Sequence, residues 1–119
     1  MQAALIDRYG SNDLVKVVDI AVPVMGPMDL LIQVHAAGVN PVDVKTRDGQ
    51  LKVLLKYRFP LVLGNDLSGV VADVGAQVRR FKKGDAIYAR LDKDRIGAFA
   101  EFALVREGAA ALKPGNVTF

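Results

Sequence analysis

Short apolar segments separated by Gly or Pro dominate the chain, and polar residues interrupt most of them at short intervals. Segment 14–22 is an example, since it combines β-branched residues with polar positions at Lys16 and Asp19. Such segments are typical of strands. The pattern predicts strands at 2–6, 14–22, 29–39, 67–74, 86–91 and 98–105. Strands at this spacing, with no long helices between them, predict a sandwich or a barrel.

One short helix is predicted from about Pro41 to Asp48. Asn40 has a side chain that caps helices, and Pro41 suits the first helical position, where the N–H that it lacks has no partner in any case. Asp43 favours the positive end of the helix dipole, and Gly49 is suited to end the helix.

Two further local expectations follow from the residues. Segment 50–56 predicts another helical turn or two, in which Leu51, Leu54 and Leu55 cover the core. Gly75 marks a backbone requirement and is expected to adopt a positive φ in a turn.

Size and composition describe one ordinary globular domain. The chain has 119 residues with no internal repeat and no linker, and 51% of its residues are hydrophobic against 24% charged. It contains no Cys, which excludes disulfides, Cys-based zinc sites and a thiol nucleophile. Its single His also excludes a two-His metal site.

Charge and hydropathy favour a protein that binds neither nucleic acid nor membrane. The 16 Lys and Arg against 13 Asp and Glu give a formal net charge of +3, and the one dense basic run, 79–83, is predicted to be a solvated turn. The longest stretch without a charged residue, 30–42, has 13 residues, whereas a membrane helix needs about 20. Asp7 and Arg8 interrupt the N-terminal apolar segment before it reaches signal-peptide length, which favours a cytoplasmic location.

The common nucleotide and hydrolase motifs are absent. No two of the 11 glycines are separated by a single residue, so there is no G-x-G-x-x-G fingerprint. Gly64 and Gly69 have the spacing of a P-loop, but Val70 follows where the phosphate-binding Lys is required. Ser68 lacks the preceding Gly of a nucleophile elbow, because Asp66 occupies that position.

Four segments carry a pattern that is more specific: AAGVNPVDVKTRDG (36–49), FPLVLGNDLSGVVADVG (59–75), VRRFKKGDAIYA (78–89) and GAFAEFALV (97–105). Their order and spacing resemble the N-terminal, GroES-like catalytic domain of the medium-chain dehydrogenase/reductase superfamily. They are most similar to its zinc-independent quinone and enone oxidoreductase branch. The resemblance implies a mainly-β fold over residues 1–119, a partly open barrel with one or two short helices. It also implies that the family's Rossmann cofactor domain is absent from this chain.

The resemblance also predicts the absence of zinc. Zinc-dependent members carry a Cys where this chain has Asn40, and a Gly-His-Glu where it has Gly64, Asn65 and Asp66. An amide is a poor replacement for thiolate or imidazole, and a remaining carboxylate alone does not supply the three or four ligands that zinc requires. No metal site is expected.

Candidate site residues cluster in the first of these segments. The resemblance implies that Asn40 lies beside the nicotinamide ribose and the substrate, that Asp43 orders the same turn, and that Lys45 faces the cofactor. A Lys ammonium in place of zinc would stabilise a developing enolate oxygen. From the residues alone, Asn40 is equally a helix cap, Asp43 supports the helix N-terminus and Lys45 is solvated.

Other polar residues have lower rank as site candidates. Tyr57 either donates its hydroxyl to a quinone oxygen or packs on the apolar segment 59–63 that follows it. Asn65 and Asp66 are expected to hold the strand entry through backbone hydrogen bonds. His35, in an extended apolar run, is expected to lie outside the site.

The resemblance implies an NADPH-dependent oxidoreductase that transfers hydride to a quinone or an α,β-unsaturated carbonyl and acts as a homodimer. Catalytic roles then fall to Lys45, Asn40 and Tyr57, and cofactor contacts to Asn40, Asp43 and Lys45, while the absent domain binds most of NADPH. The chain alone is expected to be inactive. Two alternatives are a non-catalytic binding module and an interaction protein like a co-chaperonin with the same barrel.

Overall fold

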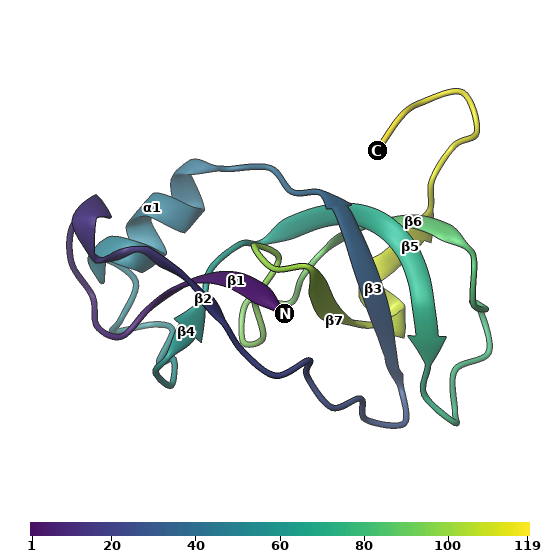
Figure 1. Cartoon of the computed structure of the whole chain (residues 1–119), viewed down its shortest axis with the longest axis horizontal. Coiled ribbons are helices and arrows are strands. Elements are labelled where there is room, and N and C mark those ends of the chain that lie inside the picture. Colours follow the sequence, from purple (N-terminus) through teal and green to yellow (C-terminus); the bar gives the residue numbers. More distant parts are fainter.

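Antiparallel strands are the main regular secondary structure of the computed structural model, which describes residues 1–119 (Figure 1). The strands are β1 (Gln2–Ile6), β2 (Lys16–Asp19), β3 (Asp29–Ala36), β4 (Leu61–Val62), β5 (Asp66–Val74), β6 (Ala86–Arg90), β7 (Phe102–Arg106) and β8 (Ala110–Leu112). The one α-helix is α1 (Pro41–Asp48), and short 3-10 turns cover Asn12–Leu14 and Glu107–Ala109. The prediction of a mainly-β fold is confirmed.

The strands form two sheets. The smaller sheet has the order β2-β1-β4 and the larger one β7-β3-β5-β6-β8, with every pairing antiparallel. An isolated bridge between Ala3 and Ala100 links β1 to the segment before β7. Helix α1 connects β3 of the larger sheet to β4 of the smaller one, so its N-terminus lies where the two sheets meet (Figure 1).

Strand alternation explains the core. In β6, Ile87 and Ala89 are buried while Tyr88 and Arg90 face solvent, as expected for a strand with one covered face. The main cluster of 12 buried hydrophobic residues draws on β3, β5, β6 and β7. A second cluster, Ile6, Leu61 and Leu63, lies under the smaller sheet.

Several strand bounds differ from the sequence prediction because tertiary hydrogen bonds set them. Segment 14–22 contributes only β2, which a 3-10 turn precedes. Segment 98–105 becomes a strand only at Phe102, because the backbone N–H of Phe99 donates to the carbonyl of Leu63 at 2.9 Å. The short strands β4 and β8 were not predicted, since neither is long enough to show an alternating pattern.

The expectation of another helical turn or two at 50–56 is correct in part. The backbone there forms hydrogen-bonded turns, with the N–H of Leu55 donating to Leu51 at 2.7 Å, but no helix. Leu54 is 82% exposed and Val53 is 81% exposed, so Leu54 does not cover the core. Leu51 and Leu55, the other two leucines expected to cover the core, are partly buried.

Close packing, not backbone conformation, explains Gly75. Its φ is not positive, so that expectation is wrong. A Cβ at this position would lie 2.4 Å from the carbonyl oxygens of Gly26 and Pro27. Gly69 is restricted in the same way, because a Cβ there would lie 2.1 Å from the carbonyl oxygen of Gln33 on the neighbouring strand.

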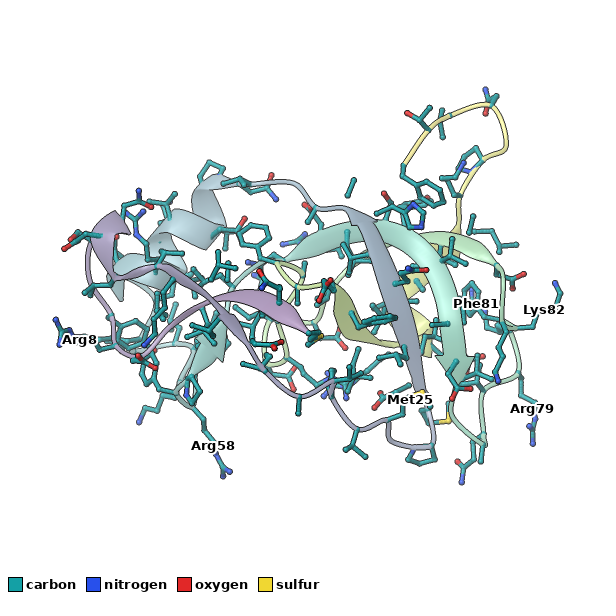
Figure 2. The ribbon with its side chains drawn as sticks, in the orientation of Figure 1. Arg8, Met25, Arg58, Arg79, Phe81 and Lys82 are labelled. Atoms are coloured by element: carbon teal, nitrogen blue, oxygen red, sulfur yellow. The ribbon has the colours of Figure 1, made fainter.

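The basic run 79–83 lies in the connection between β5 and β6, as a solvated turn would. Figure 2 shows Arg79 and Lys82 projecting away from the ribbon there. Lys82 pairs with Asp85 at 2.9 Å, whereas Phe81 turns inward and is 8% exposed.

Candidate functional site

Helix α1 begins and ends as its sequence predicts. Asn40 occupies the N-cap position with an extended backbone, φ −119° and ψ 160°, and Pro41 is the first helical residue. The Asp43 carboxylate accepts a hydrogen bond from the backbone N–H of Asn40 at 2.8 Å. Gly49 ends the helix with φ 85°, a left-handed conformation that glycine adopts at no steric cost.

A chain of amide–carboxylate hydrogen bonds joins the start of α1 to the start of β5. The Asn65 amide donates to Asp43 Oδ1 at 2.5 Å, and the Asn40 amide donates to Asp66 Oδ2 at 2.6 Å. Asp66 Oδ1 also accepts from the backbone N–H of Gly38 at 3.0 Å. Asp43 is 3% exposed and Asn65 is 7% exposed. We call these four side chains, Asn40, Asp43, Asn65 and Asp66, the amide–carboxylate network.

Asn65 and Asp66 make side-chain hydrogen bonds that the sequence did not predict. Asn65 was expected to bond to the backbone, but its amide bonds to the Asp43 side chain, from 22 positions earlier in the chain. Asp66 meets the expectation in part, because one of its donors is the backbone N–H of Gly38. The sequence signal for both was their place after Gly64, where zinc-dependent members of the family carry His and Glu.

Asn40 keeps hydrogen-bonding capacity that the network does not use. Its side chain is partly exposed, and an Asn amide has two N–H donors. One of them bonds to Asp66. The other N–H is thus available for a ligand beside the start of α1.

Lys45 stands apart from the network. It lies on an exposed face of α1, and its ammonium group forms no ion pair and no hydrogen bond within the chain. The structure therefore brings Asn40 and Asp43 together but places Lys45 in solvent, with all three of its N–H donors free.

Tyr57 is held by the protein at both ends of its side chain. Its ring packs against the cluster that contains Leu61 and Leu63, which is the packing alternative raised by the sequence. Its hydroxyl donates to the main-chain carbonyl of Lys93 at 2.5 Å. Burial of the ring raises the pKa of the Tyr57 hydroxyl above its usual value. In this structure the hydroxyl proton of Tyr57 is therefore engaged in the hydrogen bond to the Lys93 carbonyl.

Other residues add no further chemistry to the site. His35 is exposed and its ring lies 4.3 Å from that of Phe119, outside the network. No group of three or more His, Asp or Glu side chains lies close enough together to hold a metal ion. No helix combines the length and the apolar character that crossing a bilayer requires.

Comparison with known proteins identifies the domain family of the chain. Residues 26–115 match the alcohol dehydrogenase GroES-like domain. The chain is 38% identical over 119 residues to a chloroplastic quinone-oxidoreductase homolog of Spinacia oleracea, covering 99% of this chain and 36% of that protein. It is 38% identical to the chloroplastic NADPH-dependent alkenal/one oxidoreductase of Arabidopsis thaliana, over 100% of this chain and 32% of the relative.

Solved structures agree with these sequence relatives. The quinone oxidoreductase of Coxiella burnetii superposes with a TM-score of 0.89 at 32% identity, over 100% of this chain and 38% of that one. The quinone oxidoreductase of Pseudomonas syringae gives a TM-score of 0.91 at 26% identity, over 99% and 35%. The chain spans about a third of the length of the curated relatives it matches. The predicted GroES-like barrel is thus confirmed, and the chain belongs to the alcohol dehydrogenase GroES-like domain family of the medium-chain dehydrogenase/reductase superfamily.

Proposed function

We propose that this chain is the catalytic domain of an NADPH-dependent, zinc-independent oxidoreductase that reduces a quinone or an α,β-unsaturated carbonyl. The observation that carries the proposal is the amide–carboxylate network. At the positions where zinc-dependent relatives hold the metal, Asn40 and Asn65 instead donate hydrogen bonds to Asp66 and Asp43. The printed functions of the relatives, quinone and alkenal/one oxidoreductases, support this substrate class.

Without a metal, hydrogen-bond donors must stabilise the negative charge that develops on the substrate oxygen. Lys45 is the first candidate, because its ammonium group has no partner within the chain. Asn40 is the second, since one of its amide N–H groups is unused. Tyr57 ranks third, because it must release the Lys93 carbonyl before its hydroxyl can donate to a substrate.

Cofactor contacts within this chain are limited to the nicotinamide end. When bound, the nicotinamide supplies the hydride to an electron-poor carbon of the substrate. Asn40 offers a donor to the adjoining ribose, and Asp43 holds the backbone of Asn40 in place. Lys45 lies two residues after Asp43 on the same helix. We propose Asn40 and Lys45 as the cofactor contacts and Asp43, which is 3% exposed, as the residue that positions Asn40.

We expect the phosphates of NADPH to bind outside this chain. Helix N-termini commonly bind phosphate, but the first turn of α1 already carries the Asp43 carboxylate, whose negative charge opposes another anion. We therefore expect residues 1–119 alone to bind NADPH weakly or not at all and to be inactive. Calorimetric titration tests this, and a micromolar dissociation constant, corresponding to about −8 kcal/mol, would contradict it.

The proposal is tested on the full-length protein that carries this domain. NADPH oxidation is followed with a quinone and with an enone, before and after treatment with a zinc chelator, and metal content is measured on untagged protein. We expect reduction of at least one substrate, no loss on chelation and no stoichiometric zinc. One zinc per chain, or activity that chelation abolishes, contradicts the zinc-independent assignment. A ring-shaped oligomer with no NADPH oxidation would favour the co-chaperonin-like alternative. The homodimer and the cytoplasmic location remain predictions.

A further inference from the structure

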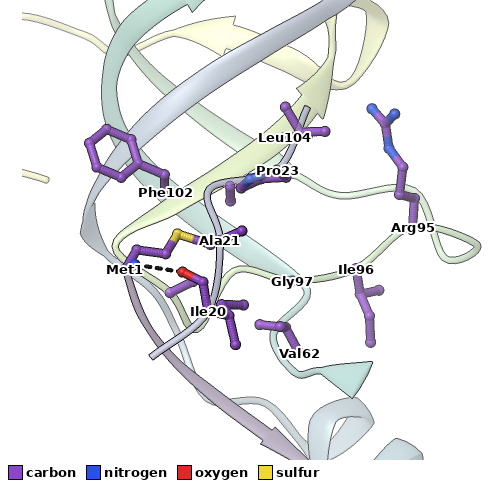
Figure 3. Close-up of a pocket in the computed structure, with 12 residues that line it drawn as sticks. Met1, Ile20, Ala21, Pro23, Val62, Arg95, Ile96, Gly97, Phe102 and Leu104 are labelled. Atoms are coloured by element: carbon purple, nitrogen blue, oxygen red, sulfur yellow. Dashed lines mark hydrogen bonds between the residues drawn. The ribbon is translucent and has the colours of Figure 1, made fainter. Parts of the chain in front are cut away.

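An apolar pocket opens beside the N-terminus, on a part of the molecule that the proposed function does not use. Its volume is about 180 Å³, and nine of its twelve lining residues are hydrophobic. Figure 3 shows the Met1 thioether and the Phe102 ring on one side, with Val62 and Ile96 across from them. None of the network side chains, nor Lys45 or Tyr57, lines this pocket.

Hydrogen bonds of the main chain form the pocket in the absence of a ligand. The Met1 ammonium donates to the carbonyl of Ile20 at 2.6 Å, which ties the N-terminus to the connection between β2 and β3 (Figure 3). The N–H of Gly97 donates to the carbonyl of Gly64 at 3.0 Å and so fixes the opposite wall. A pocket whose walls are already anchored loses little conformational entropy on binding.

The walls are electrically neutral. Arg95 is the one charged side chain of the lining, and its guanidinium makes two hydrogen bonds to Asp29, at 2.6 and 3.1 Å. The Met1 ammonium lies 2.9 Å from an Asp19 carboxylate oxygen. Since both cations are compensated and no buried side-chain polar atom lacks a partner, the pocket offers nothing to a charged ligand.

The size and the lining select a single aromatic ring. An apolar protein cavity of about 150 Å³ is known to bind benzene, and this pocket is slightly larger. The Met1 sulfur makes favourable contacts with aromatic rings. We propose that this pocket is a binding site for a neutral, single-ring aromatic molecule, separate from the site of the proposed reaction.

The test uses the 119-residue chain with its own Met1 and toluene as the probe. Methyl groups of Met1, Ile96 and Leu104 line the pocket, so methyl NMR spectra report binding at this place. We expect toluene to shift these three signals saturably. Benzoate, which has the same ring with a charge, should not shift them at the same concentration.

Two matched substitutions locate the binding. Ala21 is exposed at the rim of the pocket, and Ala21→Phe fills it with a ring. Val24 is 91% exposed, lies three residues farther along the same connection and does not line the pocket, so Val24→Phe is the control. We expect Ala21→Phe to weaken toluene binding about tenfold or more, with no change in Val24→Phe.

Three results would overturn the proposal: no saturable shift with toluene, equal binding of benzoate, or equal affinity in the two variants. The first two are measured on the unsubstituted chain, so they test the proposal even if Ala21→Phe does not fold. The circular dichroism spectrum of Ala21→Phe shows whether that variant folds. Each result leaves the proposed reductase function untouched, because that function is measured with NADPH and a quinone in the full-length protein.

Discussion

Two groups of carboxylates in this domain make similar hydrogen bonds in very different surroundings. In the amide–carboxylate network, Asp43 accepts from neutral donors and is 3% exposed. In the loop between β6 and β7, Asp92 and Asp94 accept from Arg106 at 2.8 to 3.1 Å, with side chains that are 44% and 69% exposed. The loop pairs its carboxylates with a charged donor at the surface, whereas the network pairs a buried carboxylate with neutral donors.

Burial decides which group matters for stability. When a buried carboxylate is removed, its donors lose a partner that water does not replace, which costs roughly 1–3 kcal/mol for each such group. At the surface, water solvates the freed charge and salt screens it, so exposed ion pairs contribute little. Asp29, buried at 5% exposure but paired with the partly exposed Arg95, lies between these limits.

The largest effect is expected for Asp43→Ala. This substitution leaves both the buried Asn65 amide and the backbone N–H of Asn40 without their acceptor, and we expect a loss of about 3 kcal/mol in the free energy of unfolding. Urea denaturation of the 119-residue chain measures it, with Asp92→Ala as the exposed control. Equal losses in the two variants would mean that burial does not separate the two groups.

We expect Arg95→Gln to lower the free energy of unfolding by a smaller amount, about 2 kcal/mol at neutral pH. The hydrogen bonds from Arg95 lower the pKa of Asp29 below its usual value. A carboxyl with a depressed folded-state pKa stabilises the protein above its unfolded pKa of about 3.9 and loses that contribution as the pH falls through the folded value. The difference between wild type and Arg95→Gln should therefore shrink in acid. If the difference in unfolding free energy between the two proteins stays constant as the pH falls to the folded-state pKa of Asp29, this account is contradicted.

The smallest effect is expected for Arg106→Gln. Hydrogen bonds from Arg106 lower the pKa of Asp94, yet both groups are in contact with solvent. We expect a change in the denaturation midpoint smaller than that of Arg95→Gln, and no change at about 1 M salt, where the Debye length falls to 3 Å. A loss that persists in high salt would show that the loop depends on Arg106 for more than charge.

The same contrast between local and long-range interactions explains what the sequence predicted. The bounds of α1 were correct because Asn40, Pro41 and Gly49 are signals that act within one or two turns. Leu54 was placed in the core by its spacing alone, and it is 82% exposed in the structure.

The candidate site was predictable only in part. Asn40 and Asp43 were identified through the family resemblance and their place on α1. Their link to Asn65 and Asp66 depends on how β5 meets the helix, which the spacing along the chain does not define. The Lys93 carbonyl that holds Tyr57 was not predictable either, since any residue offers a carbonyl there.

Lys45 tests the proposed chemistry most directly. Lys45 and Lys52 are both exposed and without ion pairs, so Lys45→Met and Lys52→Met are matched substitutions. In the full-length enzyme, steady-state reduction of a quinone by NADPH gives kcat and KM for both variants. If the Lys45 ammonium stabilises the developing oxygen anion, Lys45→Met lowers kcat by about 10²- to 10³-fold, with a smaller change in KM, and Lys52→Met does neither. Equal losses in the two variants, or a rise only in the KM for NADPH, would contradict that role.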